Sequence, residues 1–547
     1  MKQSTKYIFV VGGVMSSVGK GIAAASIGKI LQARGFAVTA LKIDPYVNVD
    51  AGTMNPTEHG EIFVLDDGME CDQDMGNYER FLNISLSRKN YMTTGSVYLS
   101  VITKERNLEY NGRCVDVVPD IPIEVIGKIE YAGKMDKADI VITELGGTVG
   151  DYQNILFLEA VRILKIKKPK DVFLILVSFL PALSAGGTEL KTKPTQHAIR
   201  NLNFVGLHPD IIIGRAAGSL DKKRKEIIAT TCGLEEEDII SAPNVSNIYA
   251  VPLNFEKDKL SNRILKKVGL RPRTSDLKEW RSLVKQMDSG VHPIRIGIVG
   301  KYFSTGGFIL EDSYISVIEA IKHAASDLGR KPEIDWIDSE RFEKNPAALK
   351  ELEQFQGVIV PGGFGSRGVE GKIATARYCR ENKIPYFGLC YGMQIATIEF
   401  ARNVLGLPDA HTTEINPNTK NPVIDIMPEQ KKNLKAKNYG ATMRLGAYPA
   451  NLIKGSIAEA AYRTSKISER HRHRYEVNPE YIERLEKAGF VFSGISPDRR
   501  LMEIAELPLS QHPFFLSTQF HPELKSRPLF PHPLFTAFVK ACIGKTR

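Results

Sequence analysis

Two stretches of this 547-residue chain combine residue types that could do chemistry, and the first is rich in glycine. Residues 11–21 read VGGVMSSVGKG, between an apolar run at 7–10 and a helix-like run at 22–31. Glycines let backbone N–H groups approach a polyphosphate, a helix N-terminus adds partial positive charge, and Lys20 can reach the terminal phosphates. The pattern therefore predicts a phosphate-binding loop, although glycine-rich turns before helices are often only tight connections.

This loop departs from the usual P-loop. The spacing from Gly13 to Lys20 is one residue longer, and Gly21 stands where a Ser or Thr would normally hold magnesium. Carboxylates from elsewhere must therefore bind the metal. The candidates are Asp74, at the end of an acidic run, and Glu144, at the end of an apolar strand. Acids at such strand ends bind Mg²⁺ in nucleotide-hydrolysing sheets, although acidic surface loops are common.

The second stretch surrounds a cysteine. Residues 388–394 read GLCYGMQ and place Cys390 on a sharp strand-to-helix turn between glycines, where a helix N-terminus stabilises the thiolate. A small buried cysteine at a crowded turn is the alternative. Near the C-terminus His521 offers a base and Glu523 a group to orient it, in the chain order Cys, His, Glu. Backbone N–H groups of the PGG turn at 361–363 could complete an oxyanion hole.

The elements that must position these residues alternate between strands and helices. Apolar runs typical of buried strands lie at 7–10, 38–44, 139–145, 171–179, 294–299, 357–360 and 386–389. Helix-like stretches separate them, and this order predicts parallel, doubly wound sheets whose ligands gather at the carboxyl ends of the strands. The predicted fold class is α/β with two doubly wound domains, of which the first is P-loop-like. Residues 53–74 lack helical periodicity and are interpreted as a functional loop.

Length and composition limit the domain organisation. A chain of 547 residues is too long for one ordinary core. Pro, Gly and Ser flank a short amphipathic stretch within 271–293, which predicts a linker between domains at 1–270 and 294–547. The longest apolar run, 172–180, is too short to cross a bilayer, and the N-terminus leads into the first strand without a visible signal peptide.

Cysteine use and charge exclude several classes of protein. The six cysteines show no CxxC or short-spaced pair, which favours a reducing cytoplasm and argues against zinc. The net charge of +10 could suggest nucleic acid, but the basic residues are interleaved with acids and no nucleic-acid motif is present. Anionic small substrates explain the charge better. We therefore expect a cytoplasmic protein with neither a nucleic-acid nor a membrane partner.

Several motifs of the first half together resemble the amidoligase domain of the CTP synthase family. They are GGVMSSVGKG at 12–21, KIDPY at 42–46, HGE at 59–61, YERF at 78–81, ELGGTVGD at 144–151 and KTKPTQH at 191–197. In the second half, the elbow at Cys390 with its PGG and HPE turns resembles class I glutamine amidotransferases. The resemblance implies ATP-dependent amination of UTP to CTP: ATP phosphorylates O4 of the uracil ring, and ammonia from glutamine displaces the phosphate.

The resemblance also implies roles for residues of the first half. ATP would be bound by Ser17, Val18, Gly19, Lys20, Gly21, Ile22, Asp74, Pro243, Asn244 and Val245, with Mg²⁺ on Asp74 and Glu144. UTP, and CTP as feedback inhibitor, would contact Ser16, Lys42, Asp151, Tyr152, Gln153, Lys191, Thr192, Lys193, Pro194, Thr195, Gln196 and Lys225. Gln153 replaces an acid common at the family's inhibitor site, and Lys225 is the best match for a lysine that contacts the pyrimidine nucleotide.

In the second half, the resemblance implies that Cys390, His521 and Glu523 are catalytic. L-glutamine would be bound by Gly363, Tyr391, Gly392, Met393, Gln394, Glu414 and Arg474, with backbone N–H groups near Gly363 and Tyr391 on the oxyanion. His59 would lie near the mouth of an ammonia passage. A homotetramer and GTP as activator are implied as well, although Ile315 stands where related enzymes often carry lysine.

Two other functions stay open from the residues alone. A different P-loop amidoligase fused to a glutaminase could act on a carboxylate substrate, and the motif at 191–196 argues for a pyrimidine nucleotide instead. A nucleotide-sensing scaffold or filament subunit would bind ATP and UTP without hydrolysing glutamine. Formation of CTP from UTP, ATP and glutamine distinguishes the three.

Overall fold

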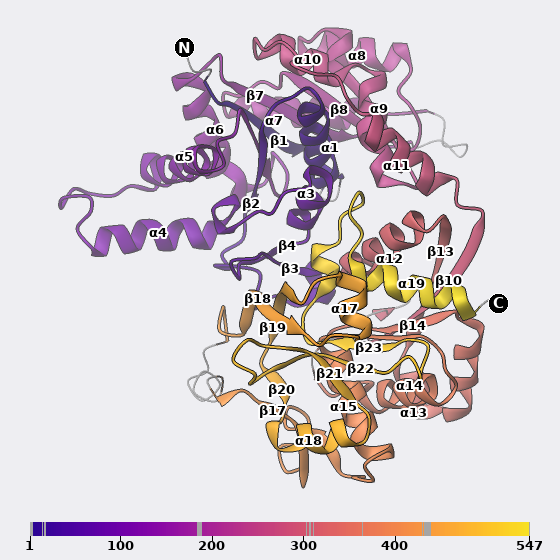
Figure 1. Cartoon of the computed structure of the whole chain (residues 1–547). Coiled ribbons are helices and arrows are strands. Elements are labelled where there is room, and N and C mark those ends of the chain that lie inside the picture. Colours follow the sequence, from indigo (N-terminus) through magenta and orange to yellow (C-terminus); the bar gives the residue numbers. More distant parts are fainter. Residues whose placement is uncertain are drawn as a thin grey trace. The chain divides into compact units, whose positions relative to one another are not determined.

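The chain folds into two compact units. The computed structural model describes residues 4–13, 15, 18–182, 189–301, 304–305, 308–309, 311–363, 365–428, 430 and 439–545. Unit 1 comprises Met1–Asp50 and Asp74–Val284, and unit 2 comprises Ala51–Gln73 and Lys285–Arg547. Both units are α/β, so the predicted fold class is confirmed (Figure 1). The predicted domain boundaries at 270 and 294 stay a prediction.

Unit 1 is built on a seven-stranded sheet whose paired strands run parallel. In spatial order its strands are β5 (Tyr91–Thr93), β2 (Val38–Asp44), β6 (Ile140–Leu145), β1 (Lys6–Gly13), β7 (Val172–Phe179), β8 (Ile211–Ala216) and β9 (Ile239–Pro243). The central strands are apolar and buried along almost their whole length, as expected for a sheet covered on both faces. The carboxyl ends of β1, β2 and β6 therefore meet at one edge.

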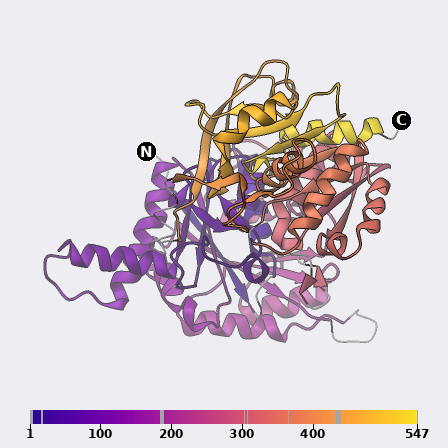
Figure 2. The same cartoon turned by 90° about the horizontal axis from the view of Figure 1, so that it is seen from below.

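Helices cover both faces of this sheet. The helices are α1 (Lys20–Ala33), α3 (Asp74–Leu82), α4 (Thr94–Arg106), α5 (Val117–Met135), α6 (Ile155–Lys167), α7 (Lys193–Phe204), α8 (Lys222–Cys232), α9 (Val251–Lys257), α10 (Leu260–Lys267) and α11 (Lys278–Asp288). Apolar residues of α5, α6 and α7 share one core with the strands, whereas α1 packs with α3 and α9 on the other face. The pair α4 and α5 extends from the sheet as an arm (Figures 1 and 2).

Unit 2 contains a nine-stranded sheet that changes direction half-way. Its order is β13 (Arg330–Asp338), β10 (His292–Gly300), β14 (Gly357–Val360), β15 (Tyr386–Leu389), β23 (Phe515–Thr518), β22 (Met502–Leu507), β21 (Val491–Ile495), β18 (Arg444–Leu452) and β19 (Lys466–His473). The pairs from β13 to β23 are parallel and those from β23 to β19 are antiparallel. The parallel half therefore gathers the ends of β14 and β15, where a ligand is expected.

Two helical layers enclose the sheet of unit 2. The helices are α12 (Ile315–Asp327), α13 (Glu340–Lys344), α14 (Val369–Glu381), α15 (Tyr391–Asn403), α17 (Ile457–Tyr462), α18 (Pro479–Lys487) and α19 (Pro533–Lys545). Apolar side chains of α14, α15 and α18 form one core, and those of α12, α17 and α19 form another. Within the described ranges, no helix combines the length and the hydropathy that crossing a membrane requires.

Residues 53–74, interpreted from sequence as a functional loop, lie largely in the segment 51–73, which contains regular structure. The short helix α2 (Pro56–His59) precedes an antiparallel pair of strands, β3 (Ile62–Val64) and β4 (Glu70–Asp72). Each of these strands has only three residues, which is too short for an alternation of apolar and polar residues to be recognised in the sequence. By its contacts this segment belongs to unit 2, although the chain before and after it belongs to unit 1.

Candidate active sites

The glycine-rich loop of unit 1 joins β1 to α1 at the carboxyl edge of the sheet. Gly19 has φ 83°, a left-handed conformation that favours glycine, directly before the helix. The Lys20 amine donates a hydrogen bond of 2.8 Å to the carbonyl of Gly147. A Cβ atom on Gly12 would lie 2.8 Å from Lys20 Nζ, so the missing side chain makes room for the lysine. Ser16 and Ser17, predicted to bind UTP and ATP, lie outside the described residues.

A cluster of charged side chains lies beside this loop. Lys42 Nζ is 2.5 Å from Asp74 Oδ2, 2.9 Å from Glu144 Oε1 and 3.8 Å from an oxygen of Asp44. The structure therefore brings together the two acids that the sequence proposes as metal ligands. A Cβ atom on Gly21 would overlap Asp74 Oδ1. The space that a Ser or Thr would use in the standard loop is thus taken by the Asp74 carboxylate.

Burial and charge push the pKa values of these acids in opposite directions. Burial raises the pKa of Glu144, and Tyr78 donates a hydrogen bond to its second oxygen. Burial also acts on Asp74, but the positive charge and the hydrogen bond of Lys42 outweigh it and lower the pKa of that carboxyl. Burial lowers the pKa of Lys20. A dry cluster of alternating charges is suited to bind a polyphosphate with its cation.

A cavity of about 420 Å³ opens next to the loop. Its lining includes Gly19, Ile22, Ala23, Ile213, Arg215, Pro243, Asn244, Val245 and Phe255. Residues from the two ends of the predicted ATP set, Gly19 with Ile22 and Pro243 to Val245, therefore face one space, and Val18 and Gly21 are their buried neighbours. Arg215, which the sequence did not single out, donates to the carbonyl of Pro243 at 3.2 Å. Its place near the carboxyl end of β8, where ligands of such sheets bind, is the feature that could have identified it from the sequence.

The predicted UTP residues divide into groups. Asp151 Oδ2 accepts a hydrogen bond of 2.6 Å from the N–H of Thr148, one residue from the carbonyl that binds Lys20. The next two residues, Tyr152 and Gln153, are exposed. The start of α7 also lies at this edge, because Ala198 packs against the position of Gly13.

Other members of the predicted UTP set make protein contacts. Thr195 is buried, and its hydroxyl lies 2.9 Å from that of Ser178. Gln196 donates to Thr192 Oγ1 at 3.2 Å, and Lys191 Nζ pairs with Glu189 at 2.7 Å. Between them, Lys193 is exposed and Pro194 is half-buried. The amine of Lys225 pairs with Asp258 at 3.0 Å. The assignment of nucleotide contacts to these residues stays a prediction.

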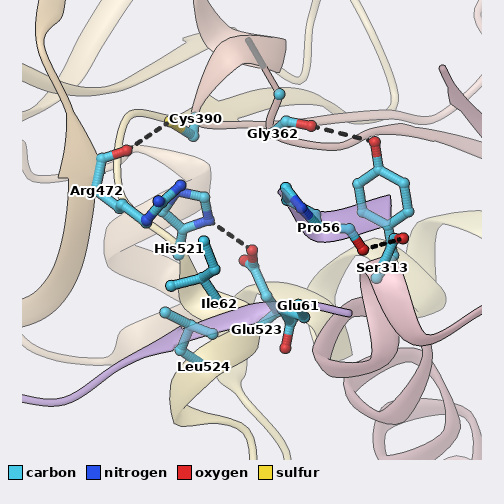
Figure 3. A pocket seen from close by; sticks show the side chains of 12 residues that line it. Pro56, Glu61, Ile62, Ser313, Gly362, Cys390, Arg472, His521, Glu523 and Leu524 are labelled. Atoms are coloured by element: carbon cyan, nitrogen blue, oxygen red, sulfur yellow. Dashed lines mark hydrogen bonds and ion pairs between the residues drawn. The ribbon is translucent and has the colours of Figure 1, made fainter. Parts of the chain in front are cut away.

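In unit 2, the three residues predicted as catalytic line one cavity of about 80 Å³ (Figure 3). His521 Nδ1 lies 2.7 Å from Glu523 Oε1, and Cys390 faces the same space. Cys390 has φ 51° and ψ −97°, a strained conformation for a residue with a side chain. A Cβ atom on Gly388 would meet the backbone of Gly392 at 2.7 Å. The geometry is that of the predicted nucleophile elbow.

Neighbouring charges raise the pKa of His521. Burial would lower the pKa of the imidazole, but the negative charges available at Cys390 and Glu523 outweigh burial and raise that pKa well above its ordinary value. Among the residues that the structure describes, His521 Nε2 has no hydrogen-bond partner. The Cys390 thiol approaches the carbonyl of Arg472 at 3.9 Å. The raised pKa of His521 therefore favours a protonated imidazole next to the Cys390 sulfur.

The predicted glutamine residues lie on different elements of unit 2, and one of them is part of the cavity wall. Gly363 lines the cavity, and Glu414 accepts a hydrogen bond of 3.0 Å from the N–H of Gly365. Tyr391, Gly392, Met393 and Gln394 form the buried first turn of α15, and Gln394 donates to the carbonyl of Tyr475 at 3.1 Å. Arg474 donates to Gln430 Oε1 at 2.7 Å and to Thr442 Oγ1 at 2.9 Å.

Residues 51–73 form part of the wall of this cavity, which the sequence did not indicate. Pro56, Glu61 and Ile62 line it together with Cys390. Polar contacts attach the segment to the rest of unit 2: Glu61 accepts hydrogen bonds from the N–H and hydroxyl of Ser316, Asp66 pairs with Arg470 at 2.6 Å, and Glu70 pairs with Arg472 at 2.8 Å. His59, expected near the mouth of a passage, ends the helix that begins at Pro56.

Comparison with known proteins gives a family match for each half of the chain. Residues 6–270 match the family model described as CTP synthase N-terminus, and residues 309–541 match that of glutamine amidotransferase class-I. A curated CTP synthase of Carboxydothermus hydrogenoformans is 51% identical, over 98% of this chain and 99% of its own length. The chain belongs to the CTP synthase family.

A second curated CTP synthase gives the same result, and one solved structure is also similar in sequence. The CTP synthase of Methanocaldococcus jannaschii is 50% identical over 99% of both chains. The solved glutaminase domain of Trypanosoma brucei CTPS with bound acivicin is 40% identical, with a TM-score of 0.42, over 46% of this chain and 94% of that one. The predicted resemblance is confirmed, and a fusion enzyme acting on a carboxylate substrate is not favoured.

Proposed function

We propose that this chain catalyses the ATP-dependent amination of UTP to CTP, with ammonia released from glutamine. The observation that carries the proposal is the presence of two built sites in a member of the CTP synthase family. One is the cavity lined by Cys390, His521 and Glu523, and the other is the charged cluster beside the phosphate loop. Each site supplies one half of the reaction.

The glutaminase half uses covalent catalysis. The Cys390 thiolate attacks the carboxamide carbon of glutamine, and His521 gives a proton to the departing ammonia. His521 then takes a proton from water, which attacks the thioester and releases glutamate. The N–H groups of Gly363 and Tyr391 stabilise the oxyanion in both steps, and loss of one such donor typically costs about a hundred- to a thousand-fold in rate. Glu414 and Arg474 bind the amino-acid end of the substrate, next to Gly392, Met393 and Gln394.

The residues of unit 1 fit a magnesium ion held with a nucleotide. Mg²⁺ prefers oxygen ligands and is usually bound by one or two carboxylates together with phosphate oxygens. Asp74 and Glu144 supply two carboxylates that lie close together, because both pair with the amine of Lys42. Within the described residues no group of three or more His, Cys, Asp or Glu side chains could hold a metal, so phosphate and water oxygens must supply the remaining ligands. When bound, Mg²⁺ neutralises phosphate charge during phosphoryl transfer.

The protein's own groups bind and orient the nucleotides. Lys20 and Lys42 pair with phosphate oxygens that gain charge as the phosphoryl group moves to O4 of UTP. The adenine of ATP occupies the cavity lined by Pro243, Asn244 and Val245. UTP, and CTP as inhibitor, bind at the edge that carries Asp151 and the start of α7.

Assembly is part of the same proposal. The arm formed by α4 and α5 exposes large apolar side chains, which are Leu99, Ile102, Leu108, Val117 and Ile123. Tyr152, next to Asp151, is 92% exposed, and Phe204 at the end of α7 is 89% exposed. Exposed apolar surface of this kind favours association with further copies. We infer a homotetramer with the pyrimidine nucleotide near subunit contacts, and GTP as activator.

The domain division and the location complete the proposal. The amidoligase domain spans 1–270 and the glutaminase domain 294–547, with a linker between them. The scattered cysteines, without short-spaced pairs, support a reducing cytoplasm as the place of the reaction.

A coupled assay of the full-length protein tests the proposed function. UTP, ATP and Mg²⁺ with either glutamine or ammonium are expected to yield CTP, ADP and phosphate. A carboxylate-specific amidoligase would give no CTP with either nitrogen source. A scaffold would bind ATP and UTP without hydrolysing glutamine. Each of these results would contradict the proposal.

A further inference from the structure

A buried lysine lies behind the glutaminase elbow. Lys372, in the first two turns of α14, is 0% exposed, and its amine has no hydrogen-bond partner among the described residues. The amine lies over the ring of Tyr391, 5.3 Å from the ring centroid. Removing an ammonium group from water without a hydrogen-bond partner is costly, whereas an apolar side chain would fill the space without that cost. Lys372 therefore lowers the stability of the fold, and a functional role would explain why a lysine stands at this position.

A second lysine contacts the same ring. Lys301, directly after β10, has its amine 6.0 Å from the Tyr391 centroid, and this amine donates to the carbonyl of Gly365 at 3.0 Å. Gly365 donates to Glu414 and follows Gly363 by two residues. Tyr391 and Gly363 are the two proposed oxyanion donors. Both sides of the proposed oxyanion hole are thus attached to buried lysines.

The contact with Tyr391 reaches the reacting groups through the backbone. Tyr391 is the first residue of α15, and Cys390 directly precedes it. The first N–H groups of a helix have no acceptor within the helix, so they can point at a developing negative charge. A side chain that holds the Tyr391 ring restrains the movement of the backbone that carries it, and with it the N–H group at the start of α15. A positive charge behind this turn further favours the oxyanion.

We propose that Lys372 is a positioning residue for glutamine hydrolysis, which holds the ring of Tyr391 and thereby the oxyanion donor at the start of α15. This inference rests on the proposed function of unit 2. Lys372 does not touch the substrate; it acts through Tyr391. Lys301 supports the same ring from β10 and connects it to the opposite side of the oxyanion hole.

The charge of Lys372 depends on pH. Burial, and then the positive charge of Lys301, lower the pKa of Lys372 from 10.5 to about 7, while Asp338 acts in the opposite direction. Burial likewise lowers the pKa of Lys301 to about 8, against the negative charge of Glu414. The groups that face Lys372 are thus Lys301, Asp338 and Tyr391. Lys372 is charged below about pH 7 and becomes neutral above it, so its effect on catalysis is largest at the lower pH.

The substitution Lys372→Met tests the proposal in the full-length protein. It is expected to lower kcat/KM for glutamine hydrolysis about tenfold at pH 6.5, as a buried cation–π contact would imply, with a smaller difference at pH 8.5. CTP formation from ammonium is expected to stay at the wild-type rate. The exposed Lys322→Met on α12 is the matched control and is expected to change neither activity.

Stability gives a second readout. The unfolded lysine binds a proton that the folded one releases, so wild-type stability rises relative to the Lys372→Met variant between about pH 7 and 10.5. The variant is therefore expected to melt at a higher temperature than wild type near pH 7, and this difference is expected to narrow as the pH rises. If the variant melts at a higher temperature yet hydrolyses glutamine more slowly, its lower activity cannot come from a less stable fold. That result would support a positioning role for Lys372.

A double-mutant cycle locates the effect at the ring. In a Tyr391→Phe background, which keeps the ring, Lys372→Met is expected to retain its effect; in Tyr391→Leu it is expected to lose it. Equal effects in both backgrounds, or wild-type kcat/KM and pH profile in Lys372→Met, would overturn the inference. If wild type itself makes no CTP from ammonium, the proposed function fails instead, and the two failures are distinguishable.

Discussion

The two sites of this chain hold their reactive groups in different states. In unit 1 the charges satisfy one another: Lys42 pairs with Asp74 and Glu144, and Lys20 donates to a backbone carbonyl. In unit 2, His521 is already oriented by Glu523, and Cys390 already faces the cavity. The glutaminase site is preorganised for its chemistry. In the proposed mechanism, the charged cluster of unit 1 exchanges these internal ion pairs for contacts with nucleotide and metal, so its activity depends more on which ligands are bound.

The largest expected effect separates the two sites. Cys390→Ala removes the nucleophile, and glutamine-dependent CTP formation is expected to fall by a factor on the order of 10⁶. CTP formation from ammonium is expected to persist, because unit 1 keeps its groups. Rates with the two nitrogen sources, measured side by side, check this. The exposed Cys114→Ala serves as control. Loss of both activities in a folded variant would show that the sites are not modular.

Lys20→Ala is expected to act in the opposite way. Without its amine the phosphate loop loses a charge that stabilises phosphoryl transfer, and CTP formation from glutamine and from ammonium is expected to fall about a hundred-fold or more. Glutamine hydrolysis without nucleotides is expected to be unchanged, which makes that assay the internal control. Retained CTP formation from ammonium would contradict the role of Lys20.

Glu523→Gln sharpens the claim that the glutaminase site is preorganised. Glu523 is one of the charges that raise the pKa of His521, so the variant is expected to lower that pKa and slow glutamine hydrolysis by about a hundred-fold. With the lower pKa, the imidazolium loses its proton at a lower pH. The alkaline limb of the profile of rate against pH is therefore expected to shift to lower pH. An unchanged alkaline limb would mean that Glu523 does not act on His521.

Glu70→Gln gives the smallest effect and tests the wall of the cavity. The substitution leaves Arg472 buried without its carboxylate partner, next to the carbonyl that contacts Cys390. Glutamine hydrolysis is expected to fall about tenfold, less than the full cost of breaking a buried ion pair, because Arg472 keeps its hydrogen bond to the carbonyl of Gly52. Glu58→Gln, in the helix α2 of the same segment, is the control. Equal rates in both variants would assign Glu70 to folding alone.

Local patterns were enough to predict the parts of each site that one stretch of chain builds. The described part of the glycine-rich loop, the elbow at Cys390 and the HPE turn lie at the strand ends where the local patterns predicted them, and their chemistry stays a prediction. The proximity of Asp74 to Glu144 followed from the missing hydroxyl at Gly21, which the Asp74 carboxylate now replaces in space.

Contacts between distant stretches could not be read in the same way. Arg215 lines the cavity beside the glycine-rich loop from β8, and Glu61 lines the cavity at Cys390 from a segment about 330 residues earlier in the chain. Neither has a local pattern that differs from an ordinary strand end or acidic loop. The Lys225 ion pair with Asp258 and the Thr195 contact with Ser178 likewise depend on packing that a single sequence does not display.

The path of residues 51–73 has a practical consequence for anyone who wishes to divide this protein. One break in the linker would give a C-terminal fragment without Pro56, Glu61 and Ile62, and with Arg470 and Arg472 deprived of their carboxylates. The matching N-terminal fragment would carry the hairpin with nothing to cover it. To divide the protein without losing these contacts, residues 51–73 must be added as a separate peptide or fused to the C-terminal fragment that contains Cys390.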